Sequence, residues 1–527
     1  MAPRTMPSPK APSEGSELVL GWRVGPSLDP SYWLERGAKA GLQPPDELFT
    51  VPSIAMATHT AIIAQSGSGK SAFLGRLIEE IALRTKARCL ILDPNADFKK
   101  VHEVAPASLW KKASYNRAIR SGRLPHESSR KQFATAWSKI PIRIRTGSEA
   151  RGVKYEPFQI SWPSLSMDFI AEDVTPMLRS ELYHCHAFVK TLGEVLRYIY
   201  LATGRITNII DEAEEIVHLV RDSDDRKYLR HELQQRFNVG SVLSNRRRVT
   251  RIGSSGFLML HGELLVSRTT VERTFERLVE GALTISDYVS REIERFYFGR
   301  ARLYQASGML QPIGTKHTRS HRHTLEIIDI PNLDRSTRLL ALDALLRTEW
   351  DRARSSWNTA VDRPEKEDTR IPTFIVVDEA HNLIPREPRN RAELALREQF
   401  RTVVAEGRKY GLFLILVSQR PDKLDSLILS ECENRAVMKL GSESVLAFAR
   451  EMLGLQDLSP KLLSKCLDFE IGRALLVGQW SPSGPQVVYA AARRTVEGGR
   501  NLRSSYWAVA KPLSVSGTAS RGPTRKK

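Results

Sequence analysis

Cysteine and long apolar runs are both scarce in this 527-residue sequence. The four cysteines show no paired spacing, which argues against a disulfide framework and against a zinc site. The longest notable apolar run, residues 412–417, has the length of a strand, whereas a membrane-spanning helix needs about 20 apolar residues. No hydrophobic stretch follows the basic residues at the N-terminus, so no secretory signal is visible. We therefore expect a soluble cytoplasmic protein with no membrane segment.

The composition is ordinary for a folded protein. With 41% hydrophobic and 26% charged residues, the sequence is unlike disordered, collagen-like and coiled-coil chains. No internal repeat is visible. The length is enough for two or three core-forming units, at roughly 100–200 residues for each domain.

The net charge of +19 is concentrated in two segments. Residues 99–154 hold fourteen Lys/Arg and three acidic residues (+11), and residues 493–527 hold nine and one (+8). Localised basic segments favour a polyanion partner, although a solvated charge run remains the alternative for both. The first segment also contains aromatic residues that could stack on bases or pack in a core. They are Trp110, Tyr115, Phe133 and Trp137.

Residues 51–98 have the pattern of a strand, a helix and a second strand. An apolar strand at 59–64 is followed by a Gly-rich turn, a helix with apolar residues at helical spacing, and a strand at 89–92. This is the βαβ unit of a parallel sheet. Strand patterns return at 325–330, 373–377 and 412–417, whereas residues 180–300 show mostly helical stripes. We therefore predict an α/β core interrupted by a largely helical insertion.

The turn after the first strand, Ala64–Ser71, fits the P-loop pattern. Its glycines allow backbone N–H groups to face phosphate oxygens at a helix N-terminus. We expect Lys70 to neutralise the β- and γ-phosphates of ATP and Ser71 to hold Mg²⁺. The predicted nucleotide-binding residues are Gln65, Ser66, Gly67, Ser68, Gly69, Lys70 and Ser71.

Two carboxylates follow the apolar strand 373–377. We expect Asp378 to support Mg²⁺ and Glu379 to polarise the attacking water. Gln419 follows the strand 412–417, where a polar side chain could sense the γ-phosphate. Arg408 lies at a basic helix end, and two roles are open for it: charge compensation at a helix C-terminus, or stabilisation of the transition state in a neighbouring subunit.

Taken together, these segments resemble the HerA/FtsK superfamily of ring-forming, DNA-translocating ATPases, and the HerA branch in particular. The matching segments, in chain order, are Ala64–Ser71, Ile91–Phe98, Leu325–Ile330, Asp378–Pro385, Glu406–Lys409, Ser418–Pro421 and Arg493–Gly499. The resemblance implies a RecA-like P-loop NTPase core with a mostly parallel sheet. The predicted units are a leader and short lead-in (1–50), the core (51–98 and 325–500), the basic, mostly helical insertion (99–324) and a basic tail (501–527).

The resemblance also implies a hexameric ring with ATP between subunits, movement along double-stranded DNA, and cooperation with a nuclease or another effector in DNA processing or antiphage defence. It favours Arg408 as a finger acting in the neighbouring site and Gln419 as the sensor. Two departures stand out. Asp97 replaces the family's usual Glu and Ala96 its Gly, so the role of that acidic residue is open. Only about 50 residues precede the core, so we expect the N-terminal β-barrel of HerA proteins to be missing.

Three alternative functions can be compared with the sequence. A conjugation coupling or DNA-packaging pump usually carries membrane segments or a nuclease domain, and neither is visible. A protein-remodelling machine of the AAA+ class is disfavoured, because the residues of the motifs resemble those of HerA proteins. An ATP-gated scaffold that controls a partner enzyme without moving DNA needs the same hydrolytic site, so sequence does not separate it from a motor. For the motor, we expect residues 99–154 to contribute to DNA contact.

Overall fold

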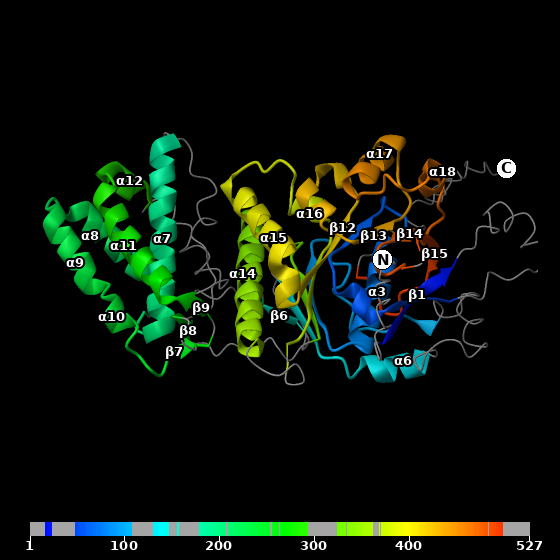
Figure 1. Ribbon diagram of the computed structural model, residues 1–527, viewed down its shortest axis with the longest axis horizontal. Coiled ribbons are helices and arrows are strands. Elements are labelled where there is room, and N and C mark those ends of the chain that lie inside the picture. The colour runs from blue at the N-terminus through cyan, green and yellow to red at the C-terminus, as the bar shows by residue number, and fades with distance from the viewer. Residues whose placement is uncertain are drawn as a thin grey trace, which may run out of the picture.

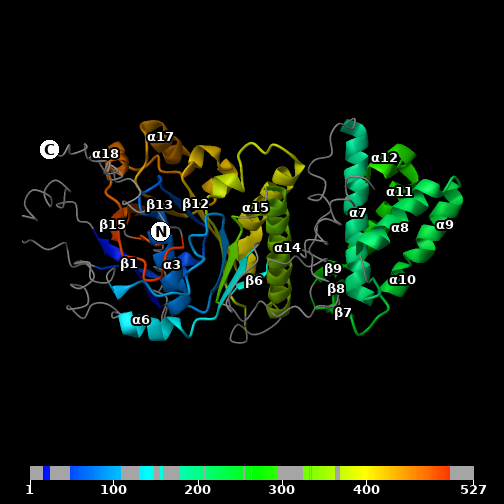
Figure 2. The ribbon, with the colours of Figure 1, turned by 180° about the vertical axis from the view of Figure 1, so that it is seen from behind.

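The computed structural model describes most of the chain. The described residues are 16–23, 48–107, 130–146, 155–157, 179–206, 209–252, 256–262, 264–293, 324–331, 333, 335–361, 368, 370–482 and 484–498. A large sheet with its helices forms one part of the molecule, and a helical unit lies beyond helix α14 (Arg335–Ala360) at the other end (Figures 1 and 2).

The central sheet has twelve strands in the order β2-β1-β15-β14-β13-β3-β12-β11-β4-β10-β5-β6. The strands from β13 to β6 pair in parallel, whereas β2, β1, β15 and β14 form an antiparallel extension at one edge. The bounds are β1 Glu17–Arg23, β2 Leu48–Pro52, β3 Thr60–Ile63, β4 Arg88–Asp93, β5 Ile142–Thr146, β6 Tyr155–Pro157, β10 Leu325–Asp329, β11 Thr373–Val377, β12 Leu412–Ser418, β13 Asn434–Val437, β14 Arg473–Val477 and β15 Gln486–Ala490.

Helices cover both faces of this sheet, which is why its central strands are apolar on both sides. Side chains of β3 alternate between two cores: Ile62 packs in the cluster that contains α3 and α6, and Ile63 in the cluster that contains α14 and α15. The helices are α3 Lys70–Arg84, α6 Arg130–Trp137, α14 Arg335–Ala360, α15 Arg391–Tyr410, α16 Ser426–Ser430, α17 Glu443–Met452 and α18 Pro460–Ser464. Short 3₁₀ helices are η2 Ser53–Met56, η8 Ala380–Asn382, η9 Pro421–Lys423 and η10 Lys465–Leu467. The predicted α/β, RecA-like fold with a mostly parallel sheet is confirmed.

The helical unit contains a small sheet that the sequence pattern did not predict. Its helices are α7 Arg179–Thr203, α8 Ile209–Asp222, α9 Arg226–Arg236, α10 Val239–Val242, α11 Arg268–Thr284 and α12 Asp287–Glu292. Three antiparallel strands join them: β7 Val249–Ile252, β8 Phe257–Leu260 and β9 Leu264–Ser267. These strands have four residues each, too few for a clear alternating pattern between longer helical stripes.

The large sheet extends beyond the boundaries expected from sequence. Strands β5 and β6 belong to it although the insertion was expected to cover residues 99–324, and β1 belongs to it although a leader and lead-in were expected over residues 1–50. The sequence pattern did not predict β5 as a strand of this sheet, because basic residues alternate with its apolar ones in Ile-Arg-Ile-Arg-Thr. Arg145 of β5 forms an ion pair of 2.8 Å with the buried Glu326 of β10.

Two aromatic residues of the basic segment are core residues. The rings of Phe133 and Trp137 stack on each other with centroids 5.4 Å apart, and both are buried. Trp137 Nε1 donates a hydrogen bond of 2.9 Å to the carbonyl of Val101. Of the two alternatives for these residues, packing is therefore correct and base stacking is wrong. Trp110 and Tyr115 lie outside the described residues.

The expectations about membranes and disulfides can be examined in the described part of the chain. None of its helices combines the length and the apolar character needed to cross a bilayer. Cys89, Cys432 and Cys466 are buried and free.

Candidate active site

The Gly-rich loop occupies the carboxyl edge of the sheet, between β3 and α3. Gly67 and Gly69 have φ angles of +75° and +93°, in the left-handed region that only glycine enters without strain. The N–H of Gln65 donates to the carbonyl of Lys439 at 2.8 Å, which ties the loop to the chain after β13. The predicted nucleotide-binding residues 65–71 therefore form a preshaped turn at a helix N-terminus, with residues 65–67 exposed to an incoming ligand.

Lys70 lies between the two predicted catalytic carboxylates. Its Nζ is 3.0 Å from Asp378 Oδ1 and also forms an ion pair with Glu379 Oε1. Burial alone would lower the pKa of Lys70, but the charge of Asp378 and the hydrogen bond to Glu379 raise it overall. The parallel pairing of β3, β12 and β11 brings these groups together across 308 residues of sequence. Lys70 is therefore charged and available for a more strongly anionic ligand.

Asp378 and Glu379 each keep an oxygen without a hydrogen bond. Oδ2 of Asp378 and Oε2 of Glu379 are buried, and neither has a hydrogen-bond partner among the described residues. Burial raises the pKa of Asp378, and Lys70 offsets this only in part. Buried oxygens of this kind are suited to a divalent cation or an ordered water, so the donor set fits Mg²⁺.

The sensor position is in contact with the second carboxylate. Gln419 Nε2 donates a hydrogen bond to Glu379 Oε1. Glu379 itself adopts a left-handed φ of +47°, which is uncommon for a residue other than glycine. His381 Nδ1 lies 3.2 Å from Ser418 Oγ and 3.5 Å from Glu379 Oε2. Burial lowers the pKa of His381, so it supports this corner as a neutral ring.

Asp97 reaches the site although the sequence left its role open. Its Oδ2 accepts a hydrogen bond of 2.8 Å from the hydroxyl of Ser71, the residue predicted to hold Mg²⁺. The loop that carries it is fixed by Asp93, whose carboxylate accepts the N–H groups of Asp97 (3.0 Å) and Phe98 (2.8 Å). Burial raises the pKa of Asp93 to about 7. The shorter Asp side chain thus still meets the P-loop.

Gly472 also contacts the P-loop, and the sequence indicated this contact only weakly. The N–H of Gly472, at the turn before β14, donates to the carbonyl of Ser68 at 2.9 Å. A Cβ atom built on Gly69 would lie 3.2 Å from Gly472 N and 3.4 Å from the side chain of Ile471. The only signal was the isolated glycine before an apolar strand.

Arg408 is not part of the site in its own chain. It lies at the end of α15, before the amino end of β12, and pairs with Glu433. Gln419 follows the carboxyl end of the same strand, and seven residues of strand span about 23 Å. Arg408 therefore lies at the opposite edge of the sheet from Lys70.

Comparisons with known proteins show similarity to HerA helicases over part of the chain. Residues 53–150 match the family model described as the central domain of helicase HerA. The probable DNA double-strand break repair helicase HerA of Methanocaldococcus jannaschii is 34% identical over 134 residues, 25% of this chain and 25% of the relative. DNA double-strand break repair helicase HerA of Pyrococcus furiosus is 24% identical over 311 residues, 52% of this chain and 54% of the relative. The predicted resemblance to the HerA/FtsK superfamily is thereby confirmed.

The matched regions are partial, since this chain spans about a quarter and about half of the length of these two curated relatives. Among solved structures, VirB4 of Thermoanaerobacter pseudethanolicus has a TM-score of 0.43 at 14% identity, covering 91% of this chain and 97% of that chain. Plasmid coupling protein TrwB in complex with a non-hydrolysable GTP analogue has a TM-score of 0.44 at 13% identity, covering 93% and 98%.

Proposed function

Because this chain carries a HerA/FtsK-type P-loop ATPase core, we propose that it couples Mg²⁺-dependent ATP hydrolysis to movement along double-stranded DNA. One observation carries the hydrolytic part of the proposal. Lys70 of the P-loop and the carboxylates Asp378 and Glu379 meet at one buried point on the carboxyl edge of the sheet. The DNA substrate is supported by the HerA relatives, which are named as DNA repair helicases.

Each residue has a role that follows from its contacts. The backbone amides of residues 65–71 and the Lys70 ammonium hold the phosphates. Ser71 and Asp378 hold Mg²⁺, which neutralises phosphate charge when it is bound. Glu379 activates the water that attacks the γ-phosphate, and Gln419 orients Glu379 through their hydrogen bond.

The ion pair between Lys70 and Glu379 then acts as a brake in the absence of nucleotide. While Lys70 holds Glu379, the Oε1 oxygen of the carboxylate faces the ammonium group instead of the attacking water. A bound triphosphate competes for the Lys70 ammonium and leaves Glu379 to Gln419 and water. Activation of the base is thus tied to the arrival of the substrate.

Assembly into a hexameric ring is the second part of the proposal. Such a ring pairs different faces of adjacent subunits, so Arg408 of one subunit can complete the site of the next. The position of Arg408 supports this role, because it lies at the edge of the sheet opposite its own P-loop. A nuclease or defence effector as partner is proposed from the family resemblance alone.

Steady-state ATPase activity with and without duplex DNA, beside a Glu379→Gln variant, tests the motor. Strong stimulation by DNA that is lost in the variant supports a translocase. ATPase activity that ignores DNA favours the alternative, an ATP-gated scaffold that regulates a partner enzyme.

Mixing subunits tests the trans role of Arg408. Arg408→Ala and Glu379→Gln rings are each expected to be inactive, whereas mixed rings contain some interfaces with both native residues and recover activity. Glu433→Gln is the matched control, because it releases Arg408 from its ion pair without removing it. An active Arg408→Ala ring would contradict the assignment.

A further inference from the structure

The helical unit carries a group of arginines that the hydrolytic site does not use. Between Glu232 and Glu263 the sequence has five arginines and no acidic residue. Three of them, Arg246, Arg247 and Arg251, are exposed on the turn before β7 and on β7 itself. None of these three side chains has an ion pair or hydrogen bond to another described residue. The net charge of the sequence does not reveal this group, because residues 155–492 are formally neutral as a whole.

The backbone of this turn is held firmly. Arg248, the fourth arginine of the group, donates from Nη1 to the carbonyls of Tyr200 (3.3 Å) and Leu201 (3.4 Å) at the end of α7. Its carbonyl accepts the N–H of His261 at 2.6 Å, which joins the turn to the next hairpin. The arrangement brings Arg205, which is exposed just after α7, to the same end of the unit. The exposed guanidinium groups are therefore presented from an ordered support.

Two other arginines of the helical unit are paired with acidic residues. Arg236, the fifth arginine of the acid-free stretch, forms ion pairs with Glu212 (2.7 Å) and Glu215 (2.6 Å) on α8. Arg268, which follows β9, pairs with Glu272 at 2.7 Å. Arg246, Arg247 and Arg251, by contrast, have no ion pair with a described acidic residue.

This group lies far from the nucleotide site. Helix α14 starts at Arg335, beside the carboxyl edge of the sheet, and runs toward the amino edge. The small sheet packs against its far part, where Ser355 Oγ lies 3.7 Å from Met259 Sδ of β8. Twenty helical residues separate Ser355 from Arg335, a rise of about 30 Å. Figure 1 shows β7, β8 and β9 at the lower end of the unit, while α16 and α17 lie at the upper side. The arginines therefore cannot reach the phosphates of ATP bound to the same subunit.

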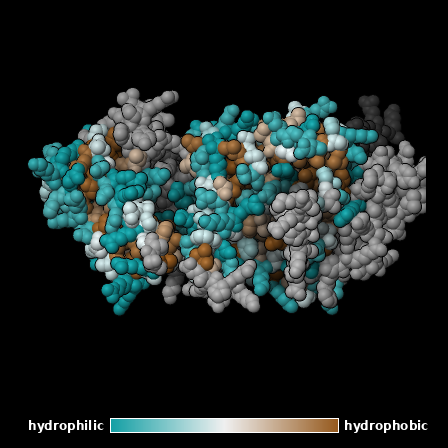
Figure 3. All heavy atoms as spheres, viewed as in Figure 1, coloured by the Kyte–Doolittle hydropathy of each residue, from teal (hydrophilic) through white to brown (hydrophobic). Residues whose placement is uncertain are grey.

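The surface at the β7 end of the helical unit is hydrophilic, as expected for a contact with a charged partner. In the same view, hydrophilic atoms cover the projecting lower end of the helical unit near α10 and β7 (Figure 3). Guanidinium groups form paired hydrogen bonds with phosphate oxygens. We propose that Arg246, Arg247 and Arg251 form a contact for the phosphate backbone of duplex DNA, separate from the ATPase core. This inference rests on the proposed function, since it adds a second point at which the motor holds its DNA.

Salt-dependent DNA binding tests the inference. Binding of a fluorescein-labelled 30-base-pair duplex is measured by anisotropy at several salt concentrations for the native protein and for Arg246→Glu/Arg247→Glu. The matched control is Lys227→Glu/Arg230→Glu, which makes the same change of charge on α9, away from the turn, at exposed residues. Removing one arginine–phosphate interaction lowers the log–log salt slope by about 0.9. We therefore expect the slope to fall by up to about 1.8 in the first variant, at about 0.9 for each of two arginines, and to stay unchanged in the control. ATPase activity without DNA is expected to be native in both variants.

Each outcome has one meaning. A weaker salt dependence confined to the Arg246/Arg247 variant supports the inference. Equal decreases in both variants indicate a net-charge effect and overturn it, and so does native binding by the Arg246/Arg247 variant. If the native protein binds no duplex DNA, with or without nucleotide, the proposed DNA motor fails as well, which separates that failure from one of the arginine contact alone.

Discussion

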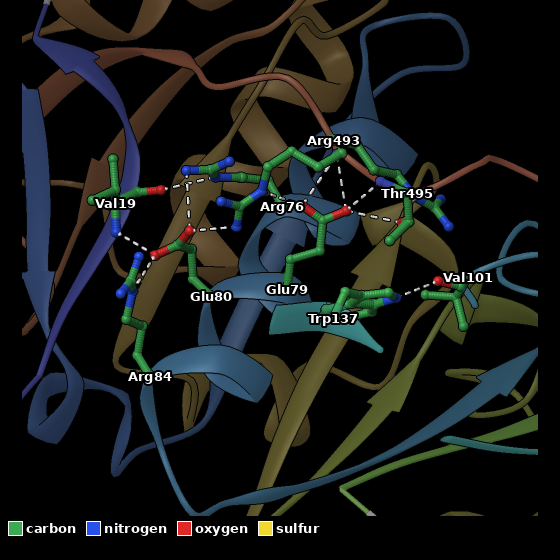
Figure 4. A network of polar contacts seen from close by, with 10 residues as sticks. Val19, Arg76, Glu79, Glu80, Arg84, Val101, Trp137, Arg493 and Thr495 are labelled. Carbon is green, nitrogen blue, oxygen red and sulfur yellow. Dashed lines mark hydrogen bonds and ion pairs between the residues drawn. The ribbon is translucent and has the colours of Figure 1, made fainter. Parts of the chain in front are cut away.

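Arg494 and Glu79 form a buried ion pair between the end of the described chain and the helix that follows the P-loop. Arg494 Nε lies 3.2 Å from Glu79 Oε2, and Arg494 Nη2 lies 2.7 Å from Oε1 of the adjacent Glu80. All three residues are at most 3% exposed. Figure 4 shows the surroundings of both carboxylates: Glu79 also accepts hydrogen bonds from Thr495, while Glu80 accepts the N–H of Val19 and faces Arg76 and Arg84.

The first prediction concerns this ion pair. Arg494→Met leaves Glu79 buried without its cation, and breaking one side of a buried pair costs about 3–5 kcal/mol. We expect the free energy of unfolding in urea to fall by about that amount. Arg273→Met, at an exposed position without an ion pair in the described structure, is the control and should change it by less than about 0.5 kcal/mol. Equal effects of the two substitutions would contradict a structural role for the pair.

The second prediction concerns the contact between Ser71 and Asp97. The hydroxyl of Ser71 donates to the carboxylate of Asp97, and in the proposed Mg²⁺ site this would leave the oxygen lone pairs of Ser71 for the ion. Loss of such an outer partner typically weakens metal binding about 10–100-fold. Asp97→Ala should therefore raise the Mg²⁺ concentration for half-maximal ATPase activity by that factor. Asp97→Glu, which restores the family's usual residue, should remain near native; an unchanged Mg²⁺ requirement in Asp97→Ala would count against the assignment.

The third prediction concerns pH. Burial raises the pKa of Asp93 to about 7 in the folded protein, against 3.8 for a free carboxyl. Between these values the folded state holds a proton that the unfolded state has lost, so the contribution of Asp93 to the free energy of unfolding decreases as the pH rises from about 4 to 7. Asp93→Asn should flatten this slope. The measurement is urea unfolding of both proteins at several pH values, and parallel profiles would refute the shift.

The fourth prediction concerns the second support of the P-loop. Gly472 has a φ of +88°, and a Cβ atom there would meet nothing closer than Tyr489 at 3.9 Å. Gly472→Ala should therefore cost about 1–2 kcal/mol through backbone strain and loosen the hydrogen bond to Ser68. We expect the KM for ATP to rise severalfold. Gly484→Ala has a similar φ of +106° and open space around it, away from the P-loop, so it should lower stability without changing KM.

The parts of the site that sequence predicts are those encoded by short local patterns. The P-loop, the carboxylates after β11 and Gln419 after β12 each follow an apolar strand, and parallel strands bring their carboxyl ends to one edge. The fold class follows from the same alternation of strands and helices. Lys70 meets Asp378 for this reason, although 308 residues separate them.

The remaining features depend on contacts that no local pattern encodes. Glu79 and Glu80 look like the solvated face of a helix, and their partner Arg494 lies more than 400 residues away. The strands β5 and β7 are too short or too charged to be recognised. The arginine group at β7 can be recognised only in the folded structure, which shows that these side chains are exposed and have no ion pair with a described residue. Such features need the three-dimensional structure.

The pair formed by Arg494 and Glu79 also bears on synthesis of the chain. Helix α3 leaves the ribosome early, but the residues that cover its carboxylates are made 415 residues later. At about 5–20 residues per second, this interval lasts roughly 20–80 s. During that time the P-loop helix lacks its buried cation, and the edge strand β1 lacks its neighbour β15. In a nascent chain, Glu79 therefore lacks its buried partner until Arg494 has been made and has folded back onto α3.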